Sequence, residues 1–195
     1  MVGCTPTMTD VTVRGAKPAD EDTLRRLFAE GMADAHKGHP EHLRQVQEYT
    51  AYNLQQDFAD IAQNYCNIAR AAFLVAEVDG VIVGGVGLHP VQIGDAPYAE
   101  TLTEEARQQT CELRRMTVSA VHRKNGIATT LLQSFEAKAK ELGYDRIHLT
   151  TGKCMIPART LYEGVGFIEI EECMTPDNLY PYCRYAKDLS FTYRG

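Results

Sequence analysis

The sequence lacks the signals that mark secreted, membrane-spanning and metal-binding proteins. Its six cysteines, at positions 4, 66, 111, 154, 173 and 183, form no CxxC pair and no spacing typical of metal ligands. The first residues contain no basic segment followed by an apolar core, and no apolar run is long enough to span a bilayer. We therefore expect a soluble, reduced, cytoplasmic protein that does not bind membranes.

Positive charge is also scarce. The 195 residues contain 20 Lys and Arg against 26 Asp and Glu, which gives a formal net charge of −6. Nonspecific binding to nucleic acid needs a clustered positive field, so nucleic acid is not an expected partner. Internal repeats and low-complexity tracts are absent, and the length suits a single domain over residues 1–195.

Apolar periodicity in the first half predicts alternating strands and helices. Residues 11–16 alternate as a strand does, and the segment after Pro18 has acids in a first turn and apolar residues on one helical face. Apolar residues three or four apart predict a helical segment over residues 40–70, broken once near its middle. Asp79-Gly80 stands between two β-branched runs, which predicts a hairpin.

The second half continues this alternation. Residues 90–109 are mostly polar, acidic and aperiodic, so we expect an exposed loop there. After this loop, CELRRMTV, RIHLTT and FIEIEE predict strands, and CRYAKDLSF is expected to close the sheet. Two helices are expected between these strands, an amphipathic one that ends at Gly143 and a short one over residues 157–164.

The stretch RKNGIA places two cations, an Asn and a Gly where a strand gives way to a helix. A helix start carries partial positive charge, so Arg123 and Lys124 do not stabilise it and suit an anion instead. Gly126 and Ala128 let backbone N–H groups approach a phosphate closely, and the helix N-terminus points at it. The alternative is an ordinary strand-to-helix turn that Asn125 caps.

Three motifs follow one another between residues 110 and 170, namely ELRRMTV, RKNGIA and ARTLYEGVGF. In order and spacing they resemble the GNAT superfamily of acetyl-CoA-dependent N-acetyltransferases, whose phosphate loop reads Q/R-x-x-G-x-G/A and whose last helix often carries A-x-x-LYE-x-x-GF. The resemblance implies an α/β fold of the GNAT acyl-CoA N-acyltransferase type. Such a fold has a mixed central sheet of about six or seven strands flanked by helices on both faces. It also implies that the helical residues 36–70 lie on the acceptor side.

The resemblance further implies acetyl-CoA as the acetyl donor and no metal. In this superfamily one strand splays from its neighbour and its backbone pairs with the pantetheine arm, while the loop and helix start bind the pyrophosphate. The implied cofactor-binding residues are Met116, Thr117 and Val118 in the strand and Arg123, Lys124, Asn125, Gly126, Ile127, Ala128 and Thr129 in the loop and helix start. Met155 departs from the many relatives that carry an Asn near this position to hydrogen-bond the pantetheine arm.

Two residues are implied in catalysis, Glu112 and Tyr162. Acetylation needs a neutral amine, so a carboxylate or an ordered water has to take a proton from the ammonium. Glu112 is the expected base, because some relatives place a Glu on the next strand where this sequence has Thr150, which is no base at neutral pH. Glu77 and a base acting only through water are alternatives. Tyr162 is the expected general acid for the leaving thiolate.

Regular alternation along ELRRMTV predicts which of its side chains share a face. The two expected sets are Glu112, Arg114 and Met116 on one face, and Leu113, Arg115 and Thr117 on the other. Two adjacent arginines are costly to bury. The alternative is therefore a solvated strand whose Arg and Glu side chains pair across neighbours, which contributes little to stability.

Two other features carry less weight. His36, His39 and His42 stand three apart, but a glycine and a proline between them interrupt any helix that would align them, so we expect no metal site. Cys154 precedes Tyr162 by eight residues, which invites a covalent acetyl-cysteine route. Direct attack by the amine needs no such intermediate, and no histidine is evidently paired with this cysteine, so we expect it only to pack.

The motifs predict an N-acetyltransferase that moves an acetyl group from acetyl-CoA directly to a primary amine of a small molecule or peptide. The alternative is a noncatalytic acyl-CoA-binding sensor module, although such a binder needs neither Tyr162 nor Glu112. A nucleotide-binding protein ranks last, because RKNGIA lacks the Lys-Ser/Thr pair of a P-loop. The net negative charge favours a cationic acceptor, and a peptide lysine, a polyamine, an amino acid and an aminoglycoside all fit, as do a monomer and a homodimer.

Overall fold

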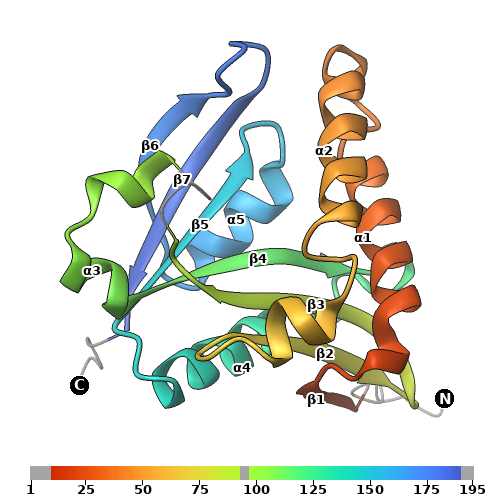
Figure 1. The fold of residues 1–195 in the computed structure, drawn as a ribbon. Helices are drawn as coiled ribbons and strands as arrows, with labels where there is room; N and C mark the ends of the chain where they lie inside the picture. The colour runs from red at the N-terminus through yellow and green to blue at the C-terminus, as the bar shows by residue number, and fades with distance from the viewer. Residues whose placement is uncertain (1–9, 93–96, 190–195) are drawn as a thin grey trace, which may run out of the picture.

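A computed structural model describes residues 10–92 and 97–189, and its centre is a seven-stranded sheet. The spatial order of the strands is β1-β2-β3-β4-β5-β7-β6 (Figure 1). Their bounds are β1 Val11–Gly15, β2 Ala72–Val78, β3 Val81–Pro90, β4 Thr110–Val118, β5 Arg146–Gly152, β6 Ile168–Met174 and β7 Pro181–Asp188. Neighbours are antiparallel except β4 and β5, which are parallel, so the sheet is mixed as predicted.

Helices cover both faces of this sheet, which confirms the predicted architecture. α1 (Glu21–Ala35) and α2 (Leu43–Gln55) lie side by side on one face, and α4 (Ile127–Glu141) packs on the other (Figure 1). The shorter helical elements are η1 Pro18–Asp20, η2 Pro40–His42, the π-helical turn η3 Ala62–Cys66, η4 Pro97–Thr101, α3 Glu104–Gln109, η5 Ala120–His122 and α5 Ile156–Gly164. None of the helices in the described ranges is both long and apolar enough to cross a lipid bilayer.

Each face of the sheet has its own apolar core. Under α4, the buried side chains include Leu131, Leu132 and Phe135, which pack with residues of β2 to β5. Under α1, Leu24 and Phe28 pack with aromatic side chains of β2 and of the segment after α2. The periodic apolar positions of both helices therefore face the sheet, as the hydrophobic pattern predicts.

Two local predictions are confirmed by backbone geometry. Asp79 and Gly80 have φ angles of +51° and +76°, and they form the two-residue turn of the β2–β3 hairpin. The helical segment expected over residues 40–70 is indeed interrupted, because α2 ends at Gln55 and helical structure resumes only as η3.

The exposed loop expected over residues 90–109 is only partly confirmed: most of residues 100–109 are exposed, but the described part of the segment contains helical turns and a small core. Tyr98 and Ala99 are 2% and 0% exposed and pack with Val91 in a small core of their own. α3 follows, and its first turn is capped by Thr103, whose hydroxyl oxygen accepts a hydrogen bond from the Ala106 N–H at 3.2 Å. Elements of one or two turns are too short to show an apolar period, so the sequence pattern missed them.

β4 and β5 pair over only a short stretch. Their ladder consists of Thr110, Cys111 and Glu112 opposite residues 146–148, and beyond it the two strands diverge (Figure 1). The backbone of Met116, Thr117 and Val118 therefore lies past the last pair with β5. This is the splayed arrangement that the resemblance implies for the pantetheine-binding strand.

His148 lies in this ladder and is buried, at 4% exposed. Neither of its ring nitrogens has a hydrogen-bond partner among the described residues, and the Tyr98 ring lies 4.8 Å away between centroids. Burial, with the nearby charges of Arg146 and Arg184, lowers the pKa of His148 to about 4. The folded protein thus holds this imidazole neutral well below neutral pH.

We expect the free energy of unfolding to decrease by up to about 3 kcal/mol between pH 6.5 and pH 4 because of His148. The pKa is lower in the folded state, so across this window the unfolded chain binds one more proton and is favoured as the pH falls. Urea unfolding at several pH values measures the effect. His148→Phe should lack this contribution to the pH dependence of the free energy of unfolding. If the variant shows the same pH dependence as the wild type, the assignment to His148 is refuted.

Candidate active site

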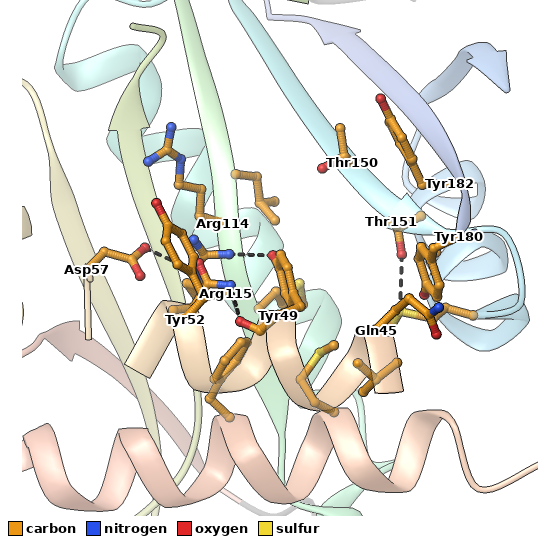
Figure 2. Close-up of a pocket in the computed structure, with 18 of the residues that line it drawn as sticks. Gln45, Tyr49, Tyr52, Asp57, Arg114, Arg115, Thr150, Thr151, Tyr180 and Tyr182 are labelled. Carbon is orange, nitrogen blue, oxygen red and sulfur yellow. Dashed lines mark hydrogen bonds and ion pairs between the residues drawn. The ribbon is translucent and has the colours of Figure 1, made fainter. Parts of the chain in front are cut away.

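A cavity of about 570 Å³ opens where β4 and β5 part. β4 and β5 form its floor, and α1, α2, α5 and the loop before β7 contribute its walls (Figure 2). Glu112, Met116 and Tyr162, which the sequence motifs selected, all line it. The fold therefore brings the two predicted catalytic residues and one predicted cofactor-binding residue into one space.

β4 does not alternate regularly along ELRRMTV. Its register with β3 shifts between Gly85 and Gly87, and Arg115 has a left-handed φ of +55°, so the strand contains a bulge. Leu113 packs in the core under α4, whereas the Thr117 hydroxyl donates to the Leu27 carbonyl of α1 at 3.1 Å.

The bulge overturns the predicted division of side chains between two faces. Leu113 and Thr117 contact opposite sides of the sheet, although regular alternation puts them together. Met116 packs against the core under α4, whereas Glu112 pairs with Arg114 in the cavity. One extra residue in a strand reverses every later position, which is why alternation failed here.

Among the residues that the structure describes, four charged side chains line the cavity, and they form two ion pairs. Arg114 donates to Glu112 Oε2 from Nε at 2.6 Å and from Nη2 at 2.5 Å. Arg115 donates from Nε to Asp57 Oδ2 at 2.8 Å and from Nη1 to the Tyr49 hydroxyl at 2.5 Å (Figure 2). These side chains are only 10–14% exposed, so the alternative of a solvated strand is wrong.

These contacts change how well each candidate fits the role of the base. The Glu112 carboxylate lies in the cavity as predicted, but it is bound to Arg114, so protonating it would weaken this ion pair. Glu77, an alternative base, is wrongly placed: it is not among the lining residues, and its carboxylate binds Arg14 Nη2 at 2.5 Å across the β1–β2 pair. Thr150 lines the cavity, but its hydroxyl is no base at neutral pH.

Tyr162 lines the cavity from α5. It is 7% exposed, its ring packs against Phe167 with centroids 5.7 Å apart, and its hydroxyl lies 3.9 Å from the Met116 sulfur. Burial raises the pKa of Tyr162 above its usual value, so the hydroxyl keeps its proton at neutral pH and above. A hydroxyl that is both buried and protonated can serve as a proton donor.

RKNGIA forms the turn that starts α4. Gly126 has a φ of +77° and is the N-cap residue, and no side chain caps the helix, so the alternative in which Asn125 caps it is wrong. The first helical N–H with a backbone acceptor there belongs to Thr130, which donates to the Gly126 carbonyl at 3.0 Å. The N–H groups of Ile127, Ala128 and Thr129 are thus free of the helix's own ladder.

The two cations of this turn differ in their surroundings. Arg123 forms an ion pair with Asp34 of α1, and its Nε donates to the Val118 carbonyl at 3.2 Å. Lys124 is exposed and has a left-handed φ of +66°. Lys124 therefore offers the more available charge to an anion at the start of α4.

Most of the other residues that line the cavity were not predicted from the sequence. Tyr49, Tyr52 and Asp57 come from α2 and the residues after it, and Tyr180 and Tyr182 flank the start of β7 (Figure 2). The only available signal was the concentration of tyrosines in residues 49–52 and 180–185. Nothing in the spacing showed that these distant segments meet at one cavity.

Among the described residues, Glu169, Glu172 and Cys183 offer ligand atoms within 4.8 Å of one another. Both carboxylates already have cationic partners: Arg159 lies 3.0 Å from Glu169 and Lys153 lies 2.6 Å from Glu172. Burial raises the pKa of the Cys183 thiol, which disfavours the thiolate form that metals bind. The cluster is thus explained by its ion pairs.

Comparisons with known sequences agree with the motifs. Residues 39–167 match the family model described as "Acetyltransferase (GNAT) family". Over 120 residues the chain is 39% identical to the mouse protein named "Probable N-acetyltransferase family 8 member 5" and 35% identical to human "N-acetyltransferase 8". Each match covers 62% of this chain and 48% of the relative, so the chain spans about half the length of these curated relatives.

Solved structures share the fold. An acetyltransferase of the GNAT family from Staphylococcus aureus Mu50 gives a TM-score of 0.67 at 20% identity, covering 93% of this chain and all of its own. A GCN5-related N-acetyltransferase from Kribbella flavida gives 0.66 at 16% identity, over 94% and 99% of the two chains. A protein from Salmonella typhimurium, solved with its cofactor acetyl-CoA, gives 0.62 at 14% identity over 95% and 98%.

Proposed function

The chain belongs to the GNAT family of acetyltransferases, and on this premise we propose that it moves an acetyl group from acetyl-CoA directly to a primary amine of a small molecule or peptide. The observation that carries the proposal is the cavity at the β4–β5 divergence, which Met116 and Tyr162 both line, in contact with each other. The structural neighbour from Salmonella typhimurium that holds acetyl-CoA supports this donor.

The donor side fits coenzyme A. The backbone of residues 116–118 has no β5 partner and suits the pantetheine arm. The free N–H groups at the start of α4 suit the pyrophosphate, and an atom built at the Cβ position of Gly126 meets nothing within 4 Å, so a ligand has room there. The donor supplies the acetyl thioester. We assign its binding to Met116, Thr117, Val118, Arg123, Lys124, Asn125, Gly126, Ile127, Ala128 and Thr129.

In the proposed reaction, the amine nitrogen forms a bond to the acetyl carbon and the carbon–sulfur bond breaks. Tyr162 gives its hydroxyl proton to the departing sulfur. The nitrogen, which starts as an ammonium, loses two protons, of which one restores Tyr162 and the other goes to a base. Glu112 is the carboxylate proposed for that base from the sequence, and its pairing with Arg114 weakens this candidacy.

The cavity walls favour an acceptor with an aromatic or apolar body. Among the described lining residues, each of the two carboxylates is bound to an arginine, so neither is left for a second cationic group of the acceptor. Six of the lining residues are aromatic: Phe28, Tyr49, Tyr52, Tyr162, Tyr180 and Tyr182. The net charge of the whole chain favours a cationic acceptor, and among the classes that fit it, a polyamine is therefore less suited to this cavity than an arylalkylamine.

We expect tyramine or phenethylamine to give a kcat/KM at least about tenfold above that of spermidine in a thiol-release assay with acetyl-CoA. Burial of the aromatic ring of the amine against the tyrosines of the cavity supplies this difference in kcat/KM. N,N-dimethyltyramine is the matched control, because it has the same ring and no primary amine, and it should release no coenzyme A above background. A higher kcat/KM for spermidine would contradict the acceptor class. Coenzyme A binding with no turnover on any amine would favour the sensor alternative.

A further inference from the structure

A histidine and a tyrosine from distant segments are hydrogen-bonded at the cavity wall. His36 is the residue that ends α1, and it is 4% exposed. Its Nε2 lies 2.7 Å from the hydroxyl of Tyr180, and its Nδ1 lies 2.8 Å from the Met32 carbonyl oxygen. Tyr180 stands just before β7 and lines the cavity (Figure 2). The pair thus connects the buried end of α1 to the acceptor space.

The partners of His36 fix the direction of these hydrogen bonds. A carbonyl oxygen only accepts, so Nδ1 carries a proton and donates to Met32. In the neutral ring Nε2 is then unprotonated and accepts from the Tyr180 hydroxyl. The lone pairs of that hydroxyl stay available for a donor from the cavity or from Cys154, whose sulfur lies 3.8 Å away. Cys154 is therefore connected to a histidine through Tyr180.

The Tyr180 hydroxyl is placed tightly against the end of β5. A Cβ built on Gly152 would lie 1.9 Å from this oxygen, so only glycine permits the arrangement. Gly152 also lines the cavity, as does Tyr162 of the next helix. The His42 ring packs edge-on against Tyr180 with centroids 5.0 Å apart, which fixes the tyrosine from a second side. The hydroxyl is thereby held where β5 borders the acceptor space.

We propose that Tyr180 and His36 take up the proton that the acceptor ammonium must lose. As the ammonium N–H bond breaks, its proton moves to the Tyr180 oxygen, and the proton of Tyr180 moves to His36 Nε2. The products of this step are a neutral amine and an imidazolium, and His36 returns its proton to solvent after turnover. The inference rests on the proposed acetyl transfer, in which Tyr180 is a catalytic residue and His36 acts through it.

The electrostatic surroundings keep both groups neutral, and thus able to accept a proton, before the step. Burial lowers the pKa of His36 below its usual value near 6.5, opposed by the Met32 hydrogen bond and assisted by the charges of His39 and His42. Burial also raises the pKa of Tyr180, with Cys154 and Tyr49 adding to the effect. At neutral pH the pair is neutral, and no counter-ion is abandoned when it gains a proton, whereas Glu112 is already bound to Arg114.

The proposed proton transfer from the ammonium through Tyr180 to His36 is called the relay below. The pH dependence of kcat/KM tests it, with the best primary amine from the acceptor assay as substrate. An enzyme with this relay uses the ammonium form, so kcat/KM of the wild type should stay level from the amine pKa down to below about pH 6.5, and then fall. His36→Gln can still accept a hydrogen bond from Tyr180 but cannot take a proton. This variant needs the free amine, so its kcat/KM should fall about tenfold for each pH unit below the amine pKa.

At pH 7 we expect His36→Gln to lose about a hundredfold in kcat/KM and to converge with the wild type above the amine pKa. Tyr180→Phe breaks the same path and should show the same slope, which gives a second variant if one folds poorly. His39→Gln, the same substitution at the residue that precedes η2, is the matched control: its kcat/KM should stay level down to the acidic limb as in the wild type, and that limb should move only slightly to higher pH because a charge that lowers the pKa of His36 is removed. Coenzyme A affinity by calorimetry should change less than about twofold in every variant.

The outcomes separate the relay from a structural clamp and from the proposed function. A wild type whose own kcat/KM already falls about tenfold per pH unit below the amine pKa overturns the relay without any variant. So does a defect in His36→Gln of equal size at every pH, which is what a clamp between α1 and the β7 segment predicts. If Glu112→Gln produces the pH-dependent slope, the base is Glu112. A wild type that acetylates no amine contradicts the proposed function, and the relay with it.

Discussion

Replacing Tyr162 with Phe is expected to lower kcat by about tenfold to a thousandfold while the affinity for coenzyme A barely changes. The substitution removes one hydroxyl and little volume. That hydroxyl is buried and protonated. It lies 3.9 Å from the sulfur of Met116, and both residues line the cavity. Without it the thiolate departs unprotonated, which raises the barrier of the chemical step and leaves ground-state binding unaffected.

Single-turnover rates, together with calorimetric titration of coenzyme A, separate chemistry from binding in this experiment. Tyr144→Phe is the matched control, because it deletes a tyrosine hydroxyl from the same apolar core, where the group donates to the Arg70 carbonyl at 3.0 Å. Tyr144 does not line the cavity, so kcat should be unchanged in that variant. An unaltered rate of the chemical step in Tyr162→Phe would remove Tyr162 from the mechanism.

Replacing Gly126 with Glu is expected to weaken coenzyme A binding by about a hundredfold or more. The residue precedes the free N–H groups of α4, so a carboxylate there repels the pyrophosphate where the fold offers it partial positive charge. The left-handed φ of +77° adds strain of about 1–3 kcal/mol for any residue with a Cβ. The open space around the Cβ position means that the side chain itself meets no protein atom there.

Gly126→Gln separates the contributions of charge and backbone strain. It carries the same bulk and the same unfavourable φ as Gly126→Glu, and it lacks the negative charge. Calorimetric titration of coenzyme A should show the glutamate variant at least about tenfold weaker than the glutamine variant, and added salt should narrow that gap. Equal affinities in the wild type and Gly126→Glu would place the pyrophosphate elsewhere.

Local chemistry explains why several features could be predicted from the sequence. Asp79-Gly80 tolerates two successive left-handed residues, which a two-residue hairpin requires, so the turn was evident from the dipeptide. The apolar period of residues 127–141 identified α4 and the face that it buries. RKNGIA and LYEGVGF are contiguous motifs, so Gly126 and Tyr162 could be selected before any tertiary contact was known.

Other features depend on contacts between residues far apart in the chain. The bulge at Arg115 reverses the faces of β4, and it goes together with contacts of that guanidinium to Asp57 and Tyr49, which lie far from β4 in the sequence. Alternation alone has no information about such partners. Similarly, the sequence could not show that Glu77 binds Arg14 away from the cavity, since the β1–β2 register decides which carboxylate faces which cation.

What the sequence by itself determined is the set of local elements and the GNAT-type motifs, and it nominated Tyr162 and the RKNGIA residues for the roles proposed above, because each depends on neighbours within a few positions. The tertiary structure alone decided which distant residues line the cavity and, among the described residues, that Glu112 pairs with Arg114 and Asp57 with Arg115. His36 and Tyr180 are 144 residues apart, and they meet only because the end of α1 and the start of β7 reach the same edge of the cavity. Hydrogen bonds at 2.7–2.8 Å are set by packing, and no sequence pattern of either segment specifies them.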